Sequence, residues 1–289
     1  MSGTGCWIGS HYAGCLSYAD DLTLLCPTAT GLQKLVDICE QYAKDYGMSF
    51  NPIKSVCILF SRGKYNMDTV PQIKLEGEIL SWKQYVKHLG NYISHDLSET
   101  KDIAMKRSDI FGRVNTVIGN LTGVSPNIVS KVFTAKCCLF YGTQIWDFTQ
   151  GSLRDFTVAW NRCVRRLLCL PNKTHCRFLA YLIDSQDPHD RICNTFIRQV
   201  ICMKNSENQL VKHIAIRGKN SETIIGKNSN YISQHYGMHT KDILKSTVSL
   251  ERCTSEDLCT IRAIKDIING NVKLPELECA MFVNYLCTN

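Results

Sequence analysis

The hydrophobic pattern of this sequence changes near residue 97, and this change most limits the folds open to the chain. Before it, short apolar runs alternate with turn-forming segments, as is typical of strands. After Ser98, apolar residues recur every three or four positions, as on one face of a helix: Ile103, Ile110, Val114 and Val117. The sequence therefore predicts an α+β fold, with a strand-rich piece over residues 1–97 followed by helical regions over 98–185 and 186–289.

The first region contains a segment with a distinctive pair of charges. Residues 13–26 hold two apolar runs separated by Asp20 and Asp21. Adjacent aspartates form turns and disfavour strands, so this segment predicts a β-hairpin with both carboxylates at its tip. The other elements expected here are a helix, a strand, a second hairpin and a last strand, over residues 28–46, 56–60, 73–80 and 85–93. The helix is expected to bury one apolar face, made of Leu32, Leu35, Val36, Cys39, Tyr42, Ala43 and Tyr46.

Proline marks helix boundaries in the later regions, because it fits the first turn of a helix and does not continue one. Ser125-Pro126 and Asp187-Pro188 predict two helix starts, and Pro171 predicts a helix end. The inward positions expected on these helices are Val129, Val132, Phe133, Leu139, Leu153, Phe156, Trp160, Val164, Leu167, Ile192, Phe196 and Val200. A last helix is expected around Ser255–Ile268.

Positive charge is concentrated in the middle of the chain. The formal net charge is +7. Residues 1–100 carry 8 basic and 10 acidic side chains, whereas residues 101–177 carry 12 basic and 4 acidic ones. A basic block of this kind suits a polyanion such as a nucleic acid, and it is equally typical of solvated helix faces.

Composition narrows the class of protein. No apolar run approaches the roughly 18 residues that a membrane span needs, and no secretory signal is visible, so an intracellular protein without a membrane partner is expected. The 16 cysteines are then expected to be reduced and packed as small apolar residues. A zinc site is the alternative, but the nearest groupings lack the paired spacing of such sites: Cys6, His11 and Cys15; Cys163 and Cys169; Cys253 and Cys259.

The tetrapeptide Tyr18-Ala19-Asp20-Asp21 is the strongest candidate for chemistry. Two carboxylates at one hairpin tip offer hard oxygen ligands of the kind that Mg²⁺ prefers. Nucleotidyl transfer uses such ligands to hold two metal ions about 3.5–4 Å apart. The same pair is also common in ordinary solvated turns, so its context matters.

That context resembles the palm of reverse transcriptases encoded by non-LTR (LINE-type) retrotransposons, over about residues 5–185. Tyr18–Asp21 looks like their YADD metal-binding hairpin, motif C. The helix followed by Gly47–Phe60 is similar to motif D, and Tyr85–Gly90 resembles motif E. The segments Leu139–Trp146 and Asn161–Pro171 look like the helical thumb and connector. The resemblance implies a partial polymerase palm followed by an all-helical, thumb-like region.

The family resemblance also implies roles for individual residues. Asp20 would be the principal Mg²⁺ ligand and Asp21 its weaker neighbour. Lys54 would be a cation near the pyrophosphate and a general acid, although a solvated lysine in a turn is the plain alternative. The residues implied for the primer grip are Lys87, His88, Leu89 and Gly90, with His88 where the family has tyrosine. The residues implied for phosphate contacts in the thumb are Arg162, Arg165, Arg166 and Lys173.

The implied function is that of a fragment of an RNA-directed DNA polymerase, with an RNA template and a DNA primer as partners. Only 19 residues precede Asp20 and none is acidic, so the motif A aspartate and the fingers of the family are missing. Two carboxylates alone are expected to hold divalent ions poorly, and the chain is expected to be truncated and inactive on its own. The alternatives are a non-catalytic nucleic-acid-binding module and a remnant of a decayed transposon.

Overall fold

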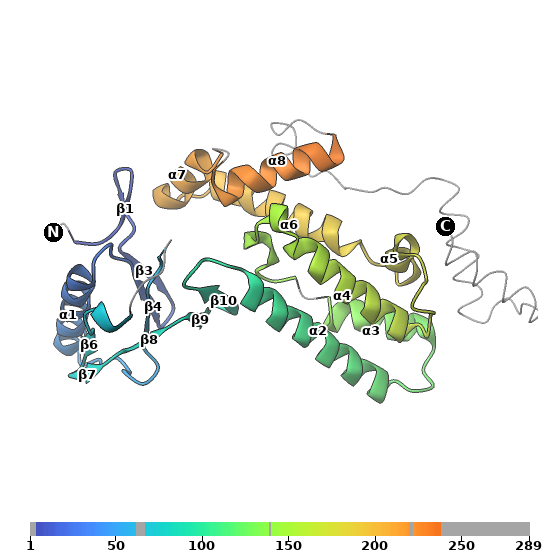
Figure 1. The fold of residues 1–289 in the computed structure, drawn as a ribbon, viewed down its shortest axis with the longest axis horizontal. Coiled ribbons are helices and arrows are strands. Elements are labelled where there is room, and N and C mark those ends of the chain that lie inside the picture. The colour runs from blue at the N-terminus through green and yellow to red at the C-terminus, as the bar shows by residue number, and fades with distance from the viewer. Residues whose placement is uncertain (1–3, 62–66, 139, 220–221, 238–289) are drawn as a thin grey trace, which may run out of the picture. The chain divides into compact units, whose positions relative to one another are not determined.

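A computed structural model describes residues 4–61, 67–138, 140–219 and 222–237 (Figure 1). The chain forms two compact units. Their bounds are Met1–Lys101 with Cys202–Gly218 for the first, and Asp102–Ile201 with Lys219–Asn289 for the second. The first unit thus takes in a late segment that the sequence pattern groups with residues 186–289.

Strands of the first unit are short and pair two by two. Their bounds are β1 (Trp7–Ile8), β2 (His11–Tyr12), β3 (Cys15–Tyr18), β4 (Asp21–Leu24), β5 (Val56–Ile58), β6 (Lys74–Leu75), β7 (Glu78–Ile79), β8 (Ser81–Lys83), β9 (Tyr85–His88) and β10 (Asn91–Ser94). The antiparallel pairs are β1–β2, β3–β4, β6–β7 and β9–β10, whereas β5 and β8 pair in parallel. The hairpins expected at Asp20-Asp21 and at Glu76-Gly77 are both present.

The single strand expected over Tyr85–Ile93 is wrong, because the structure breaks it into the hairpin β9–β10. Leu89 and Gly90 form its two-residue turn with φ values of 46° and 82°. Positive φ at both central residues is the geometry that matches the twist of the flanking strands in a tight hairpin. Gly90 adopts it readily, whereas Leu89 is held in a region that L-residues avoid.

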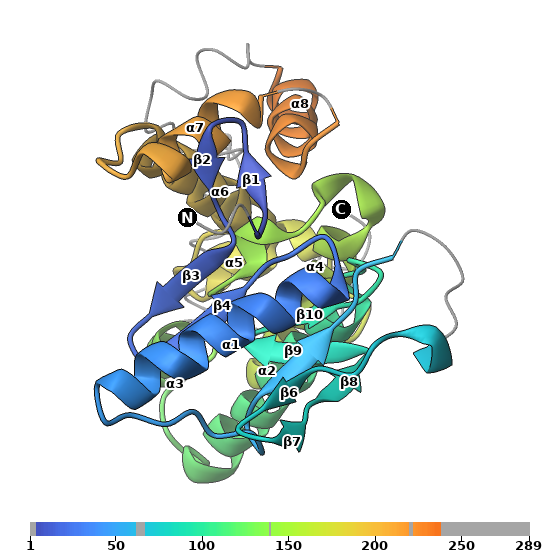
Figure 2. The ribbon, with the colours of Figure 1, turned by 90° about the vertical axis from the view of Figure 1, so that its left-hand side faces the viewer.

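One helix covers the strands of the first unit. Helix α1 (Ala29–Asp45) is capped by the Thr28 side chain, which accepts a hydrogen bond from the Gly31 amide. It lies across β4 and β6 (Figure 2). A small core joins it to the strands, made of Val36, Cys57, Ile73, Leu75 and Leu80.

The end of α1 departs from its expected burial. Tyr42 and Tyr46 are 58% and 66% exposed, so the prediction that they belong to the buried face is wrong. They pack on each other instead, with ring centroids 4.6 Å apart. The strands beneath α1 are only two residues long at β6 and β7, so they cover little of the last turn of the helix.

The second unit is a helical bundle. The helices are α2 (Thr100–Asn120), α3 (Pro126–Lys136), α4 (Ser152–Leu167), α5 (Leu179–Leu182), α6 (Pro188–Lys204) and α8 (Ile224–Tyr236), while α7 (Gln209–Arg217) belongs to the first unit. The helix starts predicted at Pro126 and Pro188 are confirmed. Helices α7 and α8 form in a polar stretch for which no individual helix was expected, within the region over 186–289 that the sequence predicts to be helical. The helix expected around Ser255–Ile268 lies outside the described residues.

The core of the second unit follows the predicted pattern. The described inward positions named above on α3, α4 and α6 are buried, with Phe133 and Trp160 fully so, except that Val132 is half-buried against the same core. Leu139 lies outside the described residues. These two rings contact each other at a centroid distance of 6.0 Å, and the Trp160 indole N–H donates to the Cys138 thiol. Apolar spacing is a strong signal here because each helix buries one face against several others.

Candidate functional site

The carboxylates of Asp20 and Asp21 lie at the tip of the β3–β4 hairpin. Tyr18 pairs with Asp21, so Ala19 and Asp20 form the two-residue turn. Ala19 has a φ of 52°, a left-handed conformation that costs a residue with a Cβ about 1–2 kcal/mol. Both aspartates are exposed, and neither forms a hydrogen bond or ion pair with another side chain in the described ranges.

A second hairpin contacts the acidic one. The His88 ring at the end of β9 lies 3.4 Å from the Thr23 hydroxyl on β4, measured from Nε2 to Oγ1. Residues two apart on a strand share a face, so Thr23 points to the same side of β4 as Asp21. Two residues span about 6.6 Å along a strand, which is the expected spacing of these two positions. The structure therefore brings together two motifs that are 65 residues apart in the sequence.

The four predicted primer-grip residues do not share one surface. His88 faces the acidic hairpin, and Leu89 with Gly90 forms the turn. Lys87 points to the opposite side of the β9–β10 hairpin, where its ammonium lies 5.9 Å from the centre of the Tyr92 ring. Alternation along the strand explains this separation, because adjacent residues point to opposite faces.

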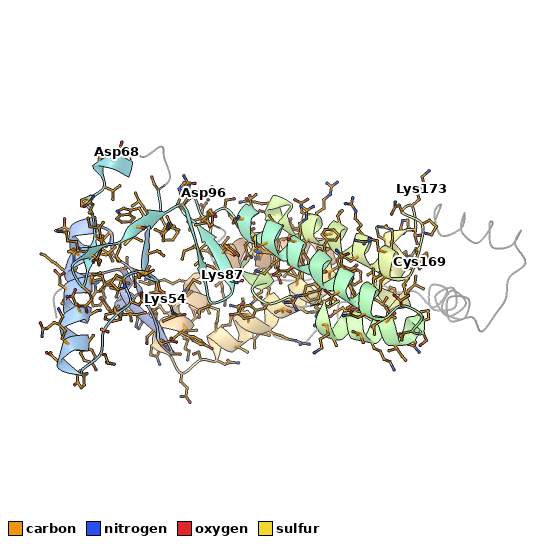
Figure 3. The ribbon with its side chains drawn as sticks, turned by 90° about the horizontal axis from the view of Figure 1, so that it is seen from below. Lys54, Asp68, Lys87, Asp96, Cys169 and Lys173 are labelled. Carbon is orange, nitrogen blue, oxygen red and sulfur yellow. The ribbon has the colours of Figure 1, made fainter. Side chains whose placement is uncertain are left out.

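Lys54 lies in a tight turn before β5 (Figure 3). The Asn51 side chain accepts hydrogen bonds from the backbone amides of Ile53 and Lys54, which holds the turn. The lysine side chain is exposed and forms no ion pair with Asp20 or Asp21. Its predicted role near a pyrophosphate stays a prediction.

The aspartate pair has the right chemistry for Mg²⁺ but too few ligands for a complete site. Six or more oxygen ligands are usual for a hard cation. In the part of the chain that the structure describes, no group of three or more His, Cys, Asp or Glu is placed to hold a metal. Asp20 and Asp21 would thus contribute to a metal site only together with ligands from elsewhere.

Helix α4 presents a basic stripe to solvent. Arg162 and Arg166 are exposed, and Arg154 occupies the same face two turns before Arg162. Val158 completes this i, i+4 row with 49% exposure. Arg154 was missed as a candidate, although its spacing of eight from Arg162 is visible in the sequence.

Arg165 points elsewhere and has a local structural role. Its guanidinium donates to the Thr174 carbonyl from Nε at 3.0 Å and from Nη2 at 2.6 Å. Nη2 also lies 3.0 Å from the Cys176 thiol. These bonds tie the loop after α4 back to the helix, so the geometry does not leave Arg165 open for the predicted phosphate contact. Lys173 stands exposed in the same loop (Figure 3).

Cysteines show no common role. The twelve described cysteines carry reduced thiols, and five of them are buried as expected for small apolar residues: Cys57, Cys137, Cys138, Cys163 and Cys193. The expected apolar packing is wrong for Cys15, Cys169, Cys176 and Cys202, which are exposed. Burial raises the pKa of the Cys163 thiol to about 12 and that of Cys138 to about 11, so these thiols are unreactive near neutral pH. Cys253 and Cys259 lie outside the described residues. No helix in the described ranges is both long and apolar enough to cross a membrane.

Comparison with known proteins shows similarity between this chain and two retrotransposon proteins. It is 24% identical over 164 residues to the retrovirus-related Pol polyprotein from type-1 retrotransposable element R1 of Bradysia coprophila. The chain is related to non-LTR retrotransposon polyproteins. It is also 22% identical over 173 residues to the RNA-directed DNA polymerase from mobile element jockey of Drosophila melanogaster. The retrotransposon relationship expected from the motifs is confirmed.

These matches cover a limited part of each protein. They include 53% and 54% of this chain, but only 16% of the R1 polyprotein and 18% of the jockey polymerase. No protein-family model and no solved structure matches the chain.

Proposed function

We propose that this chain is part of an RNA-directed DNA polymerase, in which it holds the primer end of a primer–template duplex. The first unit would be part of the palm, and the second unit would be the thumb. The contact between His88 and Thr23 carries this proposal. Through this contact, a residue predicted for the primer grip lies beside the face of β4 that carries Asp21, which supports a primer end near these carboxylates.

Asp20 and Asp21 would supply part of a Mg²⁺ centre. When complete, such a centre activates the primer 3′-hydroxyl and neutralises the leaving pyrophosphate. The exposed carboxylates suit this role, because no side chain within the described ranges pairs with them and would have to be displaced. Further carboxylates would have to come from outside the described ranges, so we expect no nucleotide incorporation by the 289-residue chain alone.

The exposed stripe on α4 would contact the phosphates of the duplex. Arg154, Arg162 and Arg166 lie on one face at intervals of one or two helical turns. Contacts of this kind are independent of base sequence and weaken steeply with salt. The concentration of positive charge in residues 101–177 supports the same assignment.

Two assays with the whole chain test the proposal. In a template-extension assay we expect no incorporation, and incorporation that disappears in Asp20→Asn would overturn the claim that the metal site is incomplete. In duplex binding, log affinity falls linearly with log salt concentration. Replacing Arg162 and Arg166 by alanine should make this negative slope shallower by about 1.8, at about 0.9 for each lost contact. Arg198→Ala on α6, also exposed, is the control and should change the slope little. An unchanged slope in the double variant would refute the proposed duplex contact.

A further inference from the structure

The β9–β10 hairpin has two faces of different character. Val86, His88 and Ile93 share the face that carries the contact to β4. On the opposite face, Tyr85, Lys87 and Tyr92 lie together, and Lys101 from the first turn of α2 reaches over them. We call the residues Tyr85, Lys87, Tyr92 and Lys101 the tyrosine–lysine face.

Contacts within the tyrosine–lysine face define its geometry. The two tyrosine ring centroids are 6.4 Å apart, and the Lys101 ammonium lies 4.8 Å from the centre of the Tyr85 ring and 6.0 Å from that of Tyr92. Lys87 and Tyr92 are cross-strand partners, and the Lys87 ammonium lies 5.9 Å from the centre of the Tyr92 ring. Two cations therefore lie close to two aromatic rings, and all four residues lie within the first unit.

The tyrosine–lysine face is partly open to solvent and carries uncompensated positive charge. Tyr85 is 48% exposed and Lys87 is exposed, whereas Tyr92 and Lys101 are half-buried. Neither Lys87 nor Lys101 forms an ion pair with a carboxylate in the described ranges. Because Tyr85 is buried only in part by its own fold, much of its apolar surface remains available to a ligand.

The exposed Tyr85 ring, combined with ammonium groups that have no carboxylate partner in the described ranges, matches one class of ligand. An unpaired base stacks on an aromatic ring whatever its identity, and lysines neutralise the flanking phosphates. In a duplex the bases stack on one another. Its phosphates could contact the lysines, but no base would be available to stack on a tyrosine ring. A carboxylate-rich peptide would likewise engage only the charges.

We propose that the tyrosine–lysine face binds single-stranded nucleic acid, with a base stacked on Tyr85 and phosphates beside Lys87 and Lys101. This proposal rests on the proposed function in one respect only, which is that the partner is a nucleic acid. It assigns to the hairpin a second surface, on the side opposite to the predicted primer end.

Binding of fluorescent oligothymidylate to the whole chain, measured by anisotropy, tests this surface. We expect Tyr85→Ala to weaken binding by about 5- to 100-fold without changing the salt slope, since stacking is not ionic. Tyr85→Phe keeps the ring and should bind as the unchanged chain does. Lys87→Ala should make the negative slope of log affinity against log salt concentration shallower by about 0.7, the value for one phosphate contact on a single strand.

A matched control is available on α1. Tyr42 is 58% exposed and packs against another tyrosine, but its neighbour Lys44 is paired with Glu40. Tyr42→Ala should therefore leave oligothymidylate binding unchanged, and circular dichroism of each variant checks the fold. Equal loss in Tyr42→Ala and Tyr85→Ala would contradict the proposal, as would full affinity in Tyr85→Ala. Displacement of the oligonucleotide by polyglutamate at equal charge would also contradict it, because charge alone would then explain binding.

Duplex binding separates this inference from the proposed function. If the chain binds duplex through Arg162 and Arg166 while Tyr85→Ala leaves oligothymidylate binding intact, the inference fails and the proposed function stands. If the chain binds neither nucleic acid at low salt, both fail.

Discussion

Asp102 near the start of α2 joins this helix to the segment that carries Trp146, so its replacement is a demanding test of the described packing. The carboxylate accepts a hydrogen bond from the Trp146 indole N–H at 2.8 Å and pairs with the Lys106 ammonium at 2.6 Å. The side chains of Asp102 and Lys106 are only 4% and 13% exposed, and Trp146 is fully buried. Asp102→Ala therefore removes the carboxylate from the buried Trp146 indole N–H and from the nearly buried Lys106 ammonium.

The expected loss follows from these two groups. Breaking a buried ion pair by removing one partner costs about 3–5 kcal/mol, and an unsatisfied buried donor alone costs about 1–3 kcal/mol. Because Lys106 retains some access to water, we place the loss for Asp102→Ala near the lower end, at about 3 kcal/mol. Asp102→Asn keeps an acceptor for the indole and should lose less.

Urea unfolding followed by circular dichroism measures this change in free energy. Asp109→Ala removes an exposed aspartate from the same helix and should change stability by less than about 0.5 kcal/mol. A loss below about 1 kcal/mol in Asp102→Ala would show that the contacts to Trp146 and Lys106 do not hold the bundle together as described.

Three further outcomes are expected. Leu89→Gly should stabilise the β9–β10 hairpin by up to about 1 kcal/mol in urea unfolding, because it relieves the left-handed φ of 46°. Burial raises the pKa of Asp147, but hydrogen bonds from Thr149 and the pairing with Lys227 outweigh it and hold the pKa below its usual value of 3.8. The stability that Asp147 contributes is thus present at neutral pH and lost as pH falls through the lowered pKa, and Lys227→Met should make acid unfolding begin at higher pH. Leu16 on β3 is 43% exposed, and we expect this apolar strand to promote self-association of the chain at high concentration, which Leu16→Lys should reduce in analytical ultracentrifugation.

The sequence predicted best the elements that depend on one repeated signal. Apolar residues at helical spacing placed Trp160 and Phe133 in the core, because a bundle helix buries a whole face. Proline at positions 126 and 188 marked helix starts through its fixed backbone geometry. The Asp20-Asp21 hairpin followed from turn chemistry alone.

Features that depend on tertiary contacts could not be predicted from the sequence, because no local pattern encodes them. The turn at Leu89-Gly90 has no typical turn dipeptide, and only Gly90 inside an apolar run hinted at it. Arg165 has the spacing of a surface arginine, but the loop that folds back to it supplies Thr174 as its acceptor. The contact between His88 and Thr23 joins segments that no local pattern relates.

Photo-crosslinking from the primer tests the central claim most directly, namely that Asp20 and Asp21 lie at the primer end of a bound duplex. A primer with a photoreactive 4-thiothymidine as its 3′-terminal nucleotide would be annealed to a template, bound to the whole chain and irradiated, and the crosslinked peptide would be identified by mass spectrometry. The account predicts a crosslink within the β3–β4 hairpin, over residues 15–24. A primer that carries the same nucleotide far from its 3′ end is the control and should not crosslink to that hairpin. A crosslink from the 3′ end to other segments alone, or equal crosslinking of the hairpin from both positions, would contradict the account.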